Sequence, residues 1–296
     1  MSEPGGVPAP VMERIGGDVW WPETGPGLQV RGAAGVEHGG LVDLAVWAAE
    51  TQNGFPPRPY RRVRLIVAGA DPTERVVSLA EAVGATLVPP PVIGTDVPGA
   101  IEAAAAAVDA EVESGTDLLV VAAPGARIAA AAVVSTLTGT EPVKVLRRGA
   151  AAADADAWMA RAVAVRDARL LINLRRGRAD PLLNGLGDPL VAFTAGVLVA
   201  AAARRTPVLL DGPLVHAAAL VAALGRPAAA AWWRAADTST DPAVSLAQDR
   251  LRLEPVLGLG TDAGDGTAGL LCVPVLRAAT AIVPHTNDSE SLDVRQ

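Results

Sequence analysis

Cysteine and histidine are scarce in this chain of 296 residues, and their scarcity excludes several kinds of site. Cys272 is the only cysteine, so an internal disulfide and a cysteine-rich metal site are both excluded. The three histidines, His38, His216 and His285, are too scattered to predict a metal cluster from their spacing. We therefore expect no metal site, and a single cysteine fits a protein of the reducing cytoplasm.

Long basic runs and long apolar runs are also missing. The net charge is −7, Lys144 is the only lysine, and arginines occur as short pairs such as Arg147-Arg148, so nucleic acid is not an expected partner. The longest apolar stretch, residues 190–203, is shorter than the roughly 20 residues that a membrane-spanning helix needs. The first residues contain no basic segment followed by an apolar one, so neither a membrane location nor a secretion signal is predicted.

Hydrophobic residues, by contrast, make up half of the chain and alternate between two patterns. Short apolar runs that end at Gly, Pro or Asp predict buried strands at residues 63–68, 118–122 and 208–210. Alanine-rich stretches predict helices at residues 41–50, 76–83, 100–113, 129–137, 157–167, 191–203 and 214–224. This alternation predicts an α/β fold with a mostly parallel sheet that helices cover on both faces.

The two ends of the chain differ from the middle in composition. Residues 1–40 are rich in Gly and Pro and predict an irregular N-terminal arm. Residues 41–284 carry the alternating pattern of the α/β domain, and residues 285–296 form a polar C-terminal tail.

Glycine, aspartate and proline collect where the predicted strands end, at residues 68–71, 123–125 and 211–213. Ligands of parallel α/β proteins bind at this edge of the sheet. None of these loops is a G-x-G-x-x-G or a Walker motif, so neither a dinucleotide nor an ATP cofactor is predicted. Asp211, directly after the third strand, either caps the helix that follows or belongs to a site.

A second acidic loop, "DAGDGTAG" at residues 262–269, places Asp265 between Gly264 and Gly266. Glycines on both sides would let backbone and carboxylate approach a bound ligand closely. Asp and Gly are equally the commonest residues of ordinary turns. Both interpretations of Asp265 stay open at this point.

The order of several segments resembles one family. These segments are "GGLVDLAVWAAETQNG", "GTDLLVVAAPG", "AAVVSTLTGTEPV", "AWMARAVAVRDA", "RRTPVLLDG" and "LRLEPVLGLGTDAGDGTAGLLCVPVLRAATAIV". In this order they resemble the nicotinate-nucleotide:dimethylbenzimidazole phosphoribosyltransferases, strongly over residues 115–283 and more faintly before. The resemblance implies a Rossmann-like sheet, a small helical subdomain from the chain ends, and a homodimer. A heterodimer with a relative is the alternative assembly.

The resemblance also implies a reaction and a set of site residues. An azole base would displace nicotinate from the ribose C1′ of nicotinate mononucleotide, which requires a phosphate site and a carboxylate that accepts the azole proton. By resemblance Asp265 is that carboxylate. The expected substrate-binding residues are Gly264, Gly266, Thr267, Gly125, Arg161, Asp211 and Ser239.

Several positions depart from the family pattern. The family has glutamate where this chain has Asp265, and a second acid where it has Ala123. The early base-site segment is shortened to residues 68–72, and residues 237–243 lack the family's histidine and arginine. Two hypotheses follow: a phosphoribosyltransferase with impaired activity, and a non-catalytic paralogue that serves as a partner subunit or a nucleotide-binding regulatory module.

Overall fold

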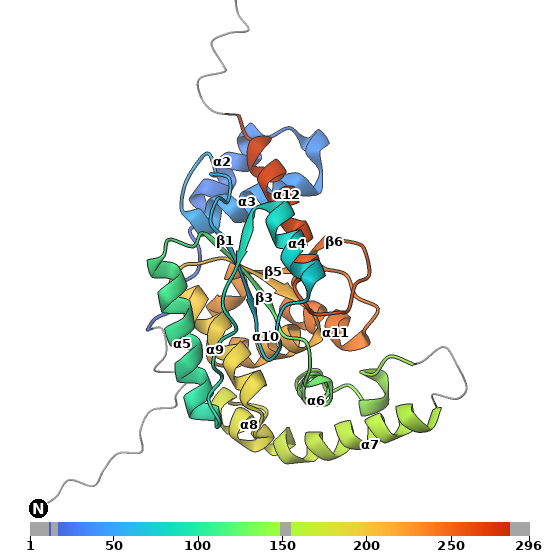
Figure 1. Ribbon diagram of the computed structural model, residues 1–296. Helices are drawn as coiled ribbons and strands as arrows, with labels where there is room; N and C mark the ends of the chain where they lie inside the picture. The colour runs from blue at the N-terminus through green and yellow to red at the C-terminus, as the bar shows by residue number, and fades with distance from the viewer. Residues whose placement is uncertain (1–11, 13–16, 149–154, 285–296) are drawn as a thin grey trace, which may run out of the picture.

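A six-stranded parallel sheet forms the centre of the protein, with the strand order β2-β1-β3-β4-β5-β6 (Figure 1). The computed structural model describes residue 12 and residues 17–148 and 155–284. The strands are β1 (Val63–Val67), β2 (Ala85–Leu87), β3 (Leu118–Ala122), β4 (Val208–Asp211), β5 (Trp233–Asp237) and β6 (Pro255–Leu257). The predicted parallel sheet is confirmed, and the three predicted strands are its neighbouring strands β1, β3 and β4.

Side chains alternate between the two faces of the sheet, and each face has its own core. Along β3, Leu119 and Val121 pack into one core, and Leu118, Val120 and Ala122 pack into the other. All five residues are fully buried, because helices cover both faces. This is why the strand reads as an unbroken apolar run in the sequence.

The helices form a layer on each face (Figure 1). The first core contains α5 (Val97–Glu113), α6 (Arg127–Thr138), α9 (Pro189–Ala203), α10 (Pro213–Gly225) and α11 (Pro242–Leu251), with α7 (Ala155–Ile172) and α8 (Ala179–Leu186) packed outside α6 and α10. The second contains α2 (Gly25–Ala33), α3 (Gly40–Gln52), α4 (Glu74–Val83) and α12 (Thr267–Ala281). Short 3-10 turns are η1 (Val36–His38), η2 (Pro142–Lys144), η4 (Asn173–Arg175) and η5 (Pro227–Trp232). No helix in the described part of the chain is long and apolar enough to cross a membrane.

Helices from the two ends of the chain pack together as α2, α3 and α12, at the top of Figure 1. The α2 helix lies inside residues 1–40, where the composition predicted no regular structure, so that prediction is wrong for residues 25–33. Pro26 stands in the first turn, where proline is tolerated, and Val30 is completely buried. Tertiary packing thus overrides the low helix propensity of Gly27 and its neighbours. Residues 1–11, 13–16 and the predicted tail at 285–296 lie outside the described residues.

The strand order reverses between β1 and β3, because the chain first moves from β1 outward to β2 and then returns to the other side. Such a switch point is the usual ligand crevice of an open α/β sheet. Here Leu190, at the start of α9, packs against the loops after β1 and β3: a Cβ on Gly69 would lie 2.9 Å from a Leu190 methyl, and one on Gly125 would lie 3.8 Å from one. Leu190 thus occupies part of this crevice.

Candidate functional site

A cavity of about 490 Å³ opens at the carboxyl edge of the sheet. Its walls come from the starts of α6, α10 and α11, the segment after η2, the middle of α7 and the loop between β6 and α12. Its charged lining residues are Arg127, Arg147, Arg148, Arg161, Asp241 and Asp262. We call it the arginine cavity.

A larger cavity of about 830 Å³ lies at the ends of α6, α10 and α11. Helices that follow parallel strands end near the amino edge of the sheet, away from the loops after the strands. We take the arginine cavity as the candidate site because it lies at the carboxyl edge, where ligands of such sheets bind.

The turn from β3 into α6 brings positive charge to the arginine cavity. Gly125 has φ +131°, and Ala126 adopts a left-handed conformation with φ +41°. The α6 helix then begins at Arg127 without a side-chain cap. Amide groups and the helix dipole at such a start favour a bound anion, and the guanidinium of Arg127 adds a full charge. Gly125 shapes this turn and does not line the cavity itself.

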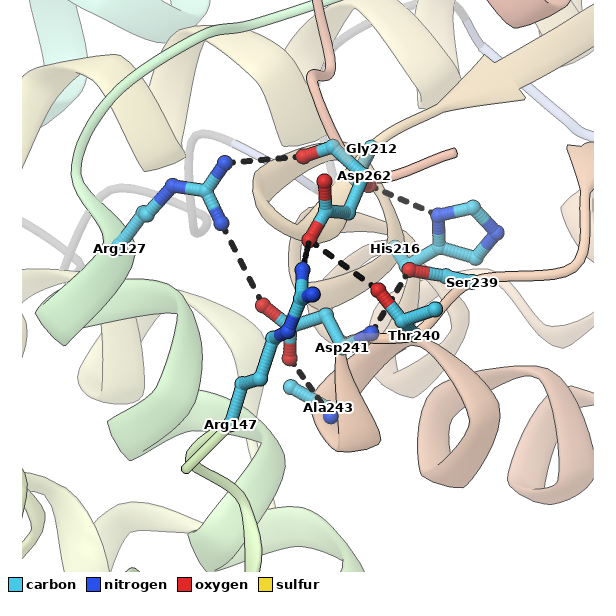
Figure 2. A network of polar contacts seen from close by, with 9 residues as sticks. All are labelled: Arg127, Arg147, Gly212, His216, Ser239, Thr240, Asp241, Ala243 and Asp262. Carbon is cyan, nitrogen blue, oxygen red and sulfur yellow. Dashed lines mark hydrogen bonds and ion pairs between the residues drawn. The ribbon is translucent and has the colours of Figure 1, made fainter. Parts of the chain in front are cut away.

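Two aspartates hold the arginines in a network that Figure 2 shows from close by. Nη1 of Arg147 donates to Oδ2 of Asp262 at 2.7 Å, and Nη2 of Arg127 donates to the main-chain oxygen of Asp262 at 2.8 Å. Thr240 Oγ1 donates to the same Asp262 Oδ2 at 3.3 Å. Nη1 of Arg127 lies 3.5 Å from Oδ2 of Asp241. The guanidinium groups are thereby aimed into one space.

Asp241 also organises the start of α11. Its Oδ1 accepts the N–H of Ala243 at 2.9 Å, and its own N–H donates to Ser239 Oγ at 3.0 Å. Burial raises the pKa of Asp241 above its usual value, while the Ala243 amide and Arg127 act against this rise. Ser239 thus orders the turn before α11, beside the cavity rather than in its lining.

The loop around Asp265 shows why this aspartate lies between glycines. A Cβ on Gly212 would lie 2.2 Å from Cα of Gly264, so the two backbones pack in direct contact. Gly266 has φ +100°, and a Cβ there would lie 2.8 Å from a methyl of Leu65. Asp265 accepts the N–H of Thr267 on Oδ1 at 3.0 Å, at the beginning of α12. The glycines therefore serve close backbone packing, and the aspartate has at least a capping role.

Asp211 and Asp237, at the ends of β4 and β5, form a buried acidic group beside this loop. Asp211 Oδ2 accepts the N–H of Gly269 at 3.0 Å. Burial, with the nearby carboxylates of Asp265 and Asp237, raises the pKa of Asp211 to about 6. Burial also acts to raise the pKa of Asp237, but hydrogen bonds from Thr261 and the backbone beside it hold that pKa below its usual value.

His216 connects the β4 turn to the surrounding helices. Its Nδ1 lies 2.8 Å from the main-chain oxygen of Gly212, and its Nε2 lies 3.3 Å from Nε2 of Gln248, which also donates to the Asp237 main-chain oxygen. Burial lowers the pKa of His216 to about 4. The imidazole is therefore neutral at physiological pH and has a structural role.

Asp211 predicts a pH-dependent effect on stability. A raised pKa means that the folded state binds the Asp211 proton more tightly than the unfolded state does. The stabilisation that this proton gives the folded state is therefore complete below pH 3.8 and is lost as the pH rises through 6. Asp211→Asn removes this dependence and retains an oxygen for the Gly269 amide. We expect the unfolding free energy of the variant, relative to wild type, to rise by about 2–3 kcal/mol between pH 4 and pH 7. Urea unfolding at several pH values measures this difference, and a constant difference would contradict it.

The expected site residues fall into two neighbouring groups. Arg161, on α7, lines the arginine cavity. Asp211, Gly264, Asp265, Gly266 and Thr267 lie beside the cavity, around the end of β4 and the start of α12. The sequence did not single out Arg127, Arg147 or Asp262. Their only local signal is the Arg147-Arg148 pair, which is too short to predict a nucleic-acid surface. Among the described residues, no group of three His, Cys, Asp or Glu side chains could hold a metal ion.

The protein is thus of the parallel α/β class, with an arginine-lined cavity at the carboxyl edge of the sheet, where ligands of such folds bind. The family model described as "Phosphoribosyltransferase" matches residues 92–294, more than half of the chain. The chain belongs to the nicotinate-nucleotide–dimethylbenzimidazole phosphoribosyltransferase family.

Individual relatives carry the same family name. The protein so named from Mycobacterium avium (strain 104) is 35% identical, covering 82% of this chain and 85% of the relative. Its counterpart from Mycobacterium tuberculosis (strain ATCC 25618 / H37Rv) is 34% identical, with 82% of each chain covered. The crystal structure of CobT from Thermus thermophilus matches with a TM-score of 0.74 at 22% identity, covering 86% of this chain and 94% of that chain. This last likeness supports the fold.

Proposed function

We propose that this protein transfers the phosphoribosyl group of nicotinate mononucleotide to a nitrogen of an azole base such as dimethylbenzimidazole. The bond between ribose C1′ and nicotinate breaks, a bond from C1′ to the azole nitrogen forms, and the azole proton passes to a carboxylate. The names of the relatives support this choice of substrates. The observation that carries it is the arginine cavity beside the loop of Asp265.

The charge of the arginine cavity fits one phosphate monoester. Four arginines against two aspartates in its lining leave a net charge of +2, and a phosphate monoester carries about −1.5 to −2 at pH 7. Guanidinium groups suit phosphate because their planar N–H forks bind two oxygens at once. We assign the donor's phosphate to this cavity, with Arg127, Arg147 and Arg161 as its ligands.

Asp265 is the carboxylate that we assign to the azole proton. It lies on the same loop as Asp262, three residues further on, so the chain between them spans at most about 10 Å. A donor with its phosphate at the arginines would place its ribose towards the glycine loop. That carboxylate is held by its neighbours Gly264, Gly266 and Thr267, and Asp211 lies behind it. Gly125 orders the turn that carries Arg127, and Ser239 orders the turn that carries Asp241.

Changing Arg127 tests the phosphate assignment. Charge-assisted hydrogen bonds contribute about 1.5–3 kcal/mol, so Arg127→Gln should raise KM for nicotinate mononucleotide by about 10- to 100-fold. The measurement is nicotinate release with varied donor and a saturating azole. Arg166→Gln is the matched control, because Arg166 lies on α7, is paired with Asp167 and does not line the cavity. Equal KM values for both variants would refute the assignment.

A non-catalytic paralogue is the second candidate, either as a partner subunit or as a nucleotide-binding module. Two observations favour it. One carboxylate oxygen of Asp265 already accepts the hydrogen bond of the Thr267 amide, and Ala123, directly after β3, is buried and uncharged. Such a protein would bind nicotinate mononucleotide without releasing nicotinate. Single-turnover assays with several azole bases separate it from a slow enzyme.

We further propose that the protein forms a homodimer, or a heterodimer with a relative, in the cytoplasm. Trp20 and Trp21 support a partner surface, since they are 63% and 65% exposed. Trp232 and Trp233 do not support a partner surface, because both are buried. Trp232 donates its indole N–H to the main-chain oxygen of Trp20.

A further inference from the structure

Asp262 lies where it competes with any anion that enters the arginine cavity. Its Oδ2 takes a hydrogen bond from Arg147 at 2.7 Å, and its main-chain oxygen takes one from Arg127 at 2.8 Å. Both guanidinium groups line the cavity, and so does Asp262 itself. A phosphate that bound Arg147 at the same N–H would have to replace the carboxylate there (Figure 2).

The Arg147–Asp262 pair is exposed enough to exchange partners. The side chain of Arg147 is 59% exposed and that of Asp262 is 29% exposed. Pairs of this kind contribute little net stability, because both groups are well hydrated when apart. A dianionic phosphate that several arginines bind together therefore outcompetes the single carboxylate.

Hydrogen bonds hold the chain in place on both sides of Asp262. Asp237 holds the amides of Leu259 and Thr261 at 2.6 and 2.8 Å, before Asp262. After it, Asp265 holds the amide of Thr267 at the start of α12. Between these points the backbone of Gly264 packs directly on Gly212, so a rotation of the Asp262 side chain away from Arg147 leaves the loop fixed.

We propose that Asp262 is a displaceable internal anion: it holds Arg147 and Arg127 in place before the donor arrives, and the donor's phosphate then replaces its carboxylate at Arg147. Asp262 is then a positioning residue that sets donor affinity. The identity of the donor rests on the proposed function, whereas displacement by phosphate itself does not.

Binding of inorganic phosphate to the full-length protein tests the competition. Asp262→Asn removes the charge and keeps an oxygen for the Thr240 hydroxyl, so phosphate should bind about two- to fivefold more tightly by calorimetry at low salt. Asp262→Glu restores the charge and should return the affinity towards that of wild type. Asp167→Asn is the matched control, because Asp167 forms a 2.7 Å pair with Arg166 outside the cavity, and it should leave the affinity unchanged.

A crystal structure of wild type with inorganic phosphate gives a second measurement that requires no variant. We expect phosphate between Arg127 and Arg147, and the Asp262 carboxylate displaced from hydrogen-bonding distance of Arg147. Phosphate bound with the Arg147–Asp262 pair intact, or unchanged phosphate affinity in Asp262→Asn, overturns the proposal. Displacement of Asp262 by phosphate, without nicotinate release from nicotinate mononucleotide in the presence of any azole, refutes the proposed reaction and leaves this inference standing. Nicotinate release without displacement of Asp262 by phosphate refutes only this inference and leaves the proposed reaction standing.

Discussion

Replacing Asp265 with asparagine is expected to slow nicotinate release by about 10² to 10⁴-fold, the usual contribution of a general base. The variant separates the two roles of this side chain. An asparagine oxygen can still accept the Thr267 amide, which the Asp265 Oδ1 accepts at 3.0 Å, but a neutral amide cannot take up the azole proton. The unfolding free energy should therefore change little while the single-turnover rate falls.

Asp265→Glu provides the comparison for this experiment. Glutamate restores the length of the family's carboxylate, so the rate should rise if the shorter aspartate limits proton transfer. It also loses the close hydrogen bond to the Thr267 amide, which should lower the unfolding free energy by about 1 kcal/mol. A wild-type rate that Asp265→Asn leaves unaffected would show that Asp265 is only a helix cap.

Gly212→Ala is expected to lower the unfolding free energy by about 2–6 kcal/mol, among the largest effects of any single methyl group here. Gly212 has φ +89° and ψ 172°, a conformation that only glycine adopts without strain. Its missing Cβ would lie 2.2 Å from Cα of Gly264, and this contact is with backbone that cannot rotate away. The substitution should push the Asp265 loop away from β4, and so reduce nicotinate release together with stability.

Two other glycines serve as controls that separate the cost of backbone strain from the cost of the close contact with Gly264. Gly187 has φ +67° with nothing within 4 Å of an added Cβ, so Gly187→Ala should cost only about 1–2 kcal/mol for the left-handed conformation. Gly258 has neither a positive φ nor a neighbour within 4 Å, so Gly258→Ala should lie within about 0.5 kcal/mol of wild type. Denaturant unfolding of the three variants measures the series, and a Gly212→Ala loss no larger than that of Gly187→Ala would contradict the role of backbone contact.

The short outer strands were beyond prediction from sequence. β2 and β6 have three residues each, and most of their residues are partly exposed, so they show no continuous apolar run. The α2 helix was missed because three glycines weaken its local preference, while its packing against α3 comes from residues further along the chain. The local sequence pattern of a helix or strand is weak wherever contacts with distant parts of the chain stabilise that element.

The sequence by itself determined the layered α/β architecture, because strands that are buried on both faces must be continuously apolar and helices must repeat every 3.6 residues. It also determined that Asp265 lies between two glycines, and the family resemblance made Arg161 a candidate for binding phosphate. Only the tertiary structure decided where the arginine cavity lies. Arg127, Arg147 and Arg161 come from three separate segments, and Asp262 lies more than a hundred residues beyond Arg147. Their charges form one cavity because the order of the strands places the starts of α6 and α11 at the same edge of the sheet, and no local pattern in the sequence encodes that proximity.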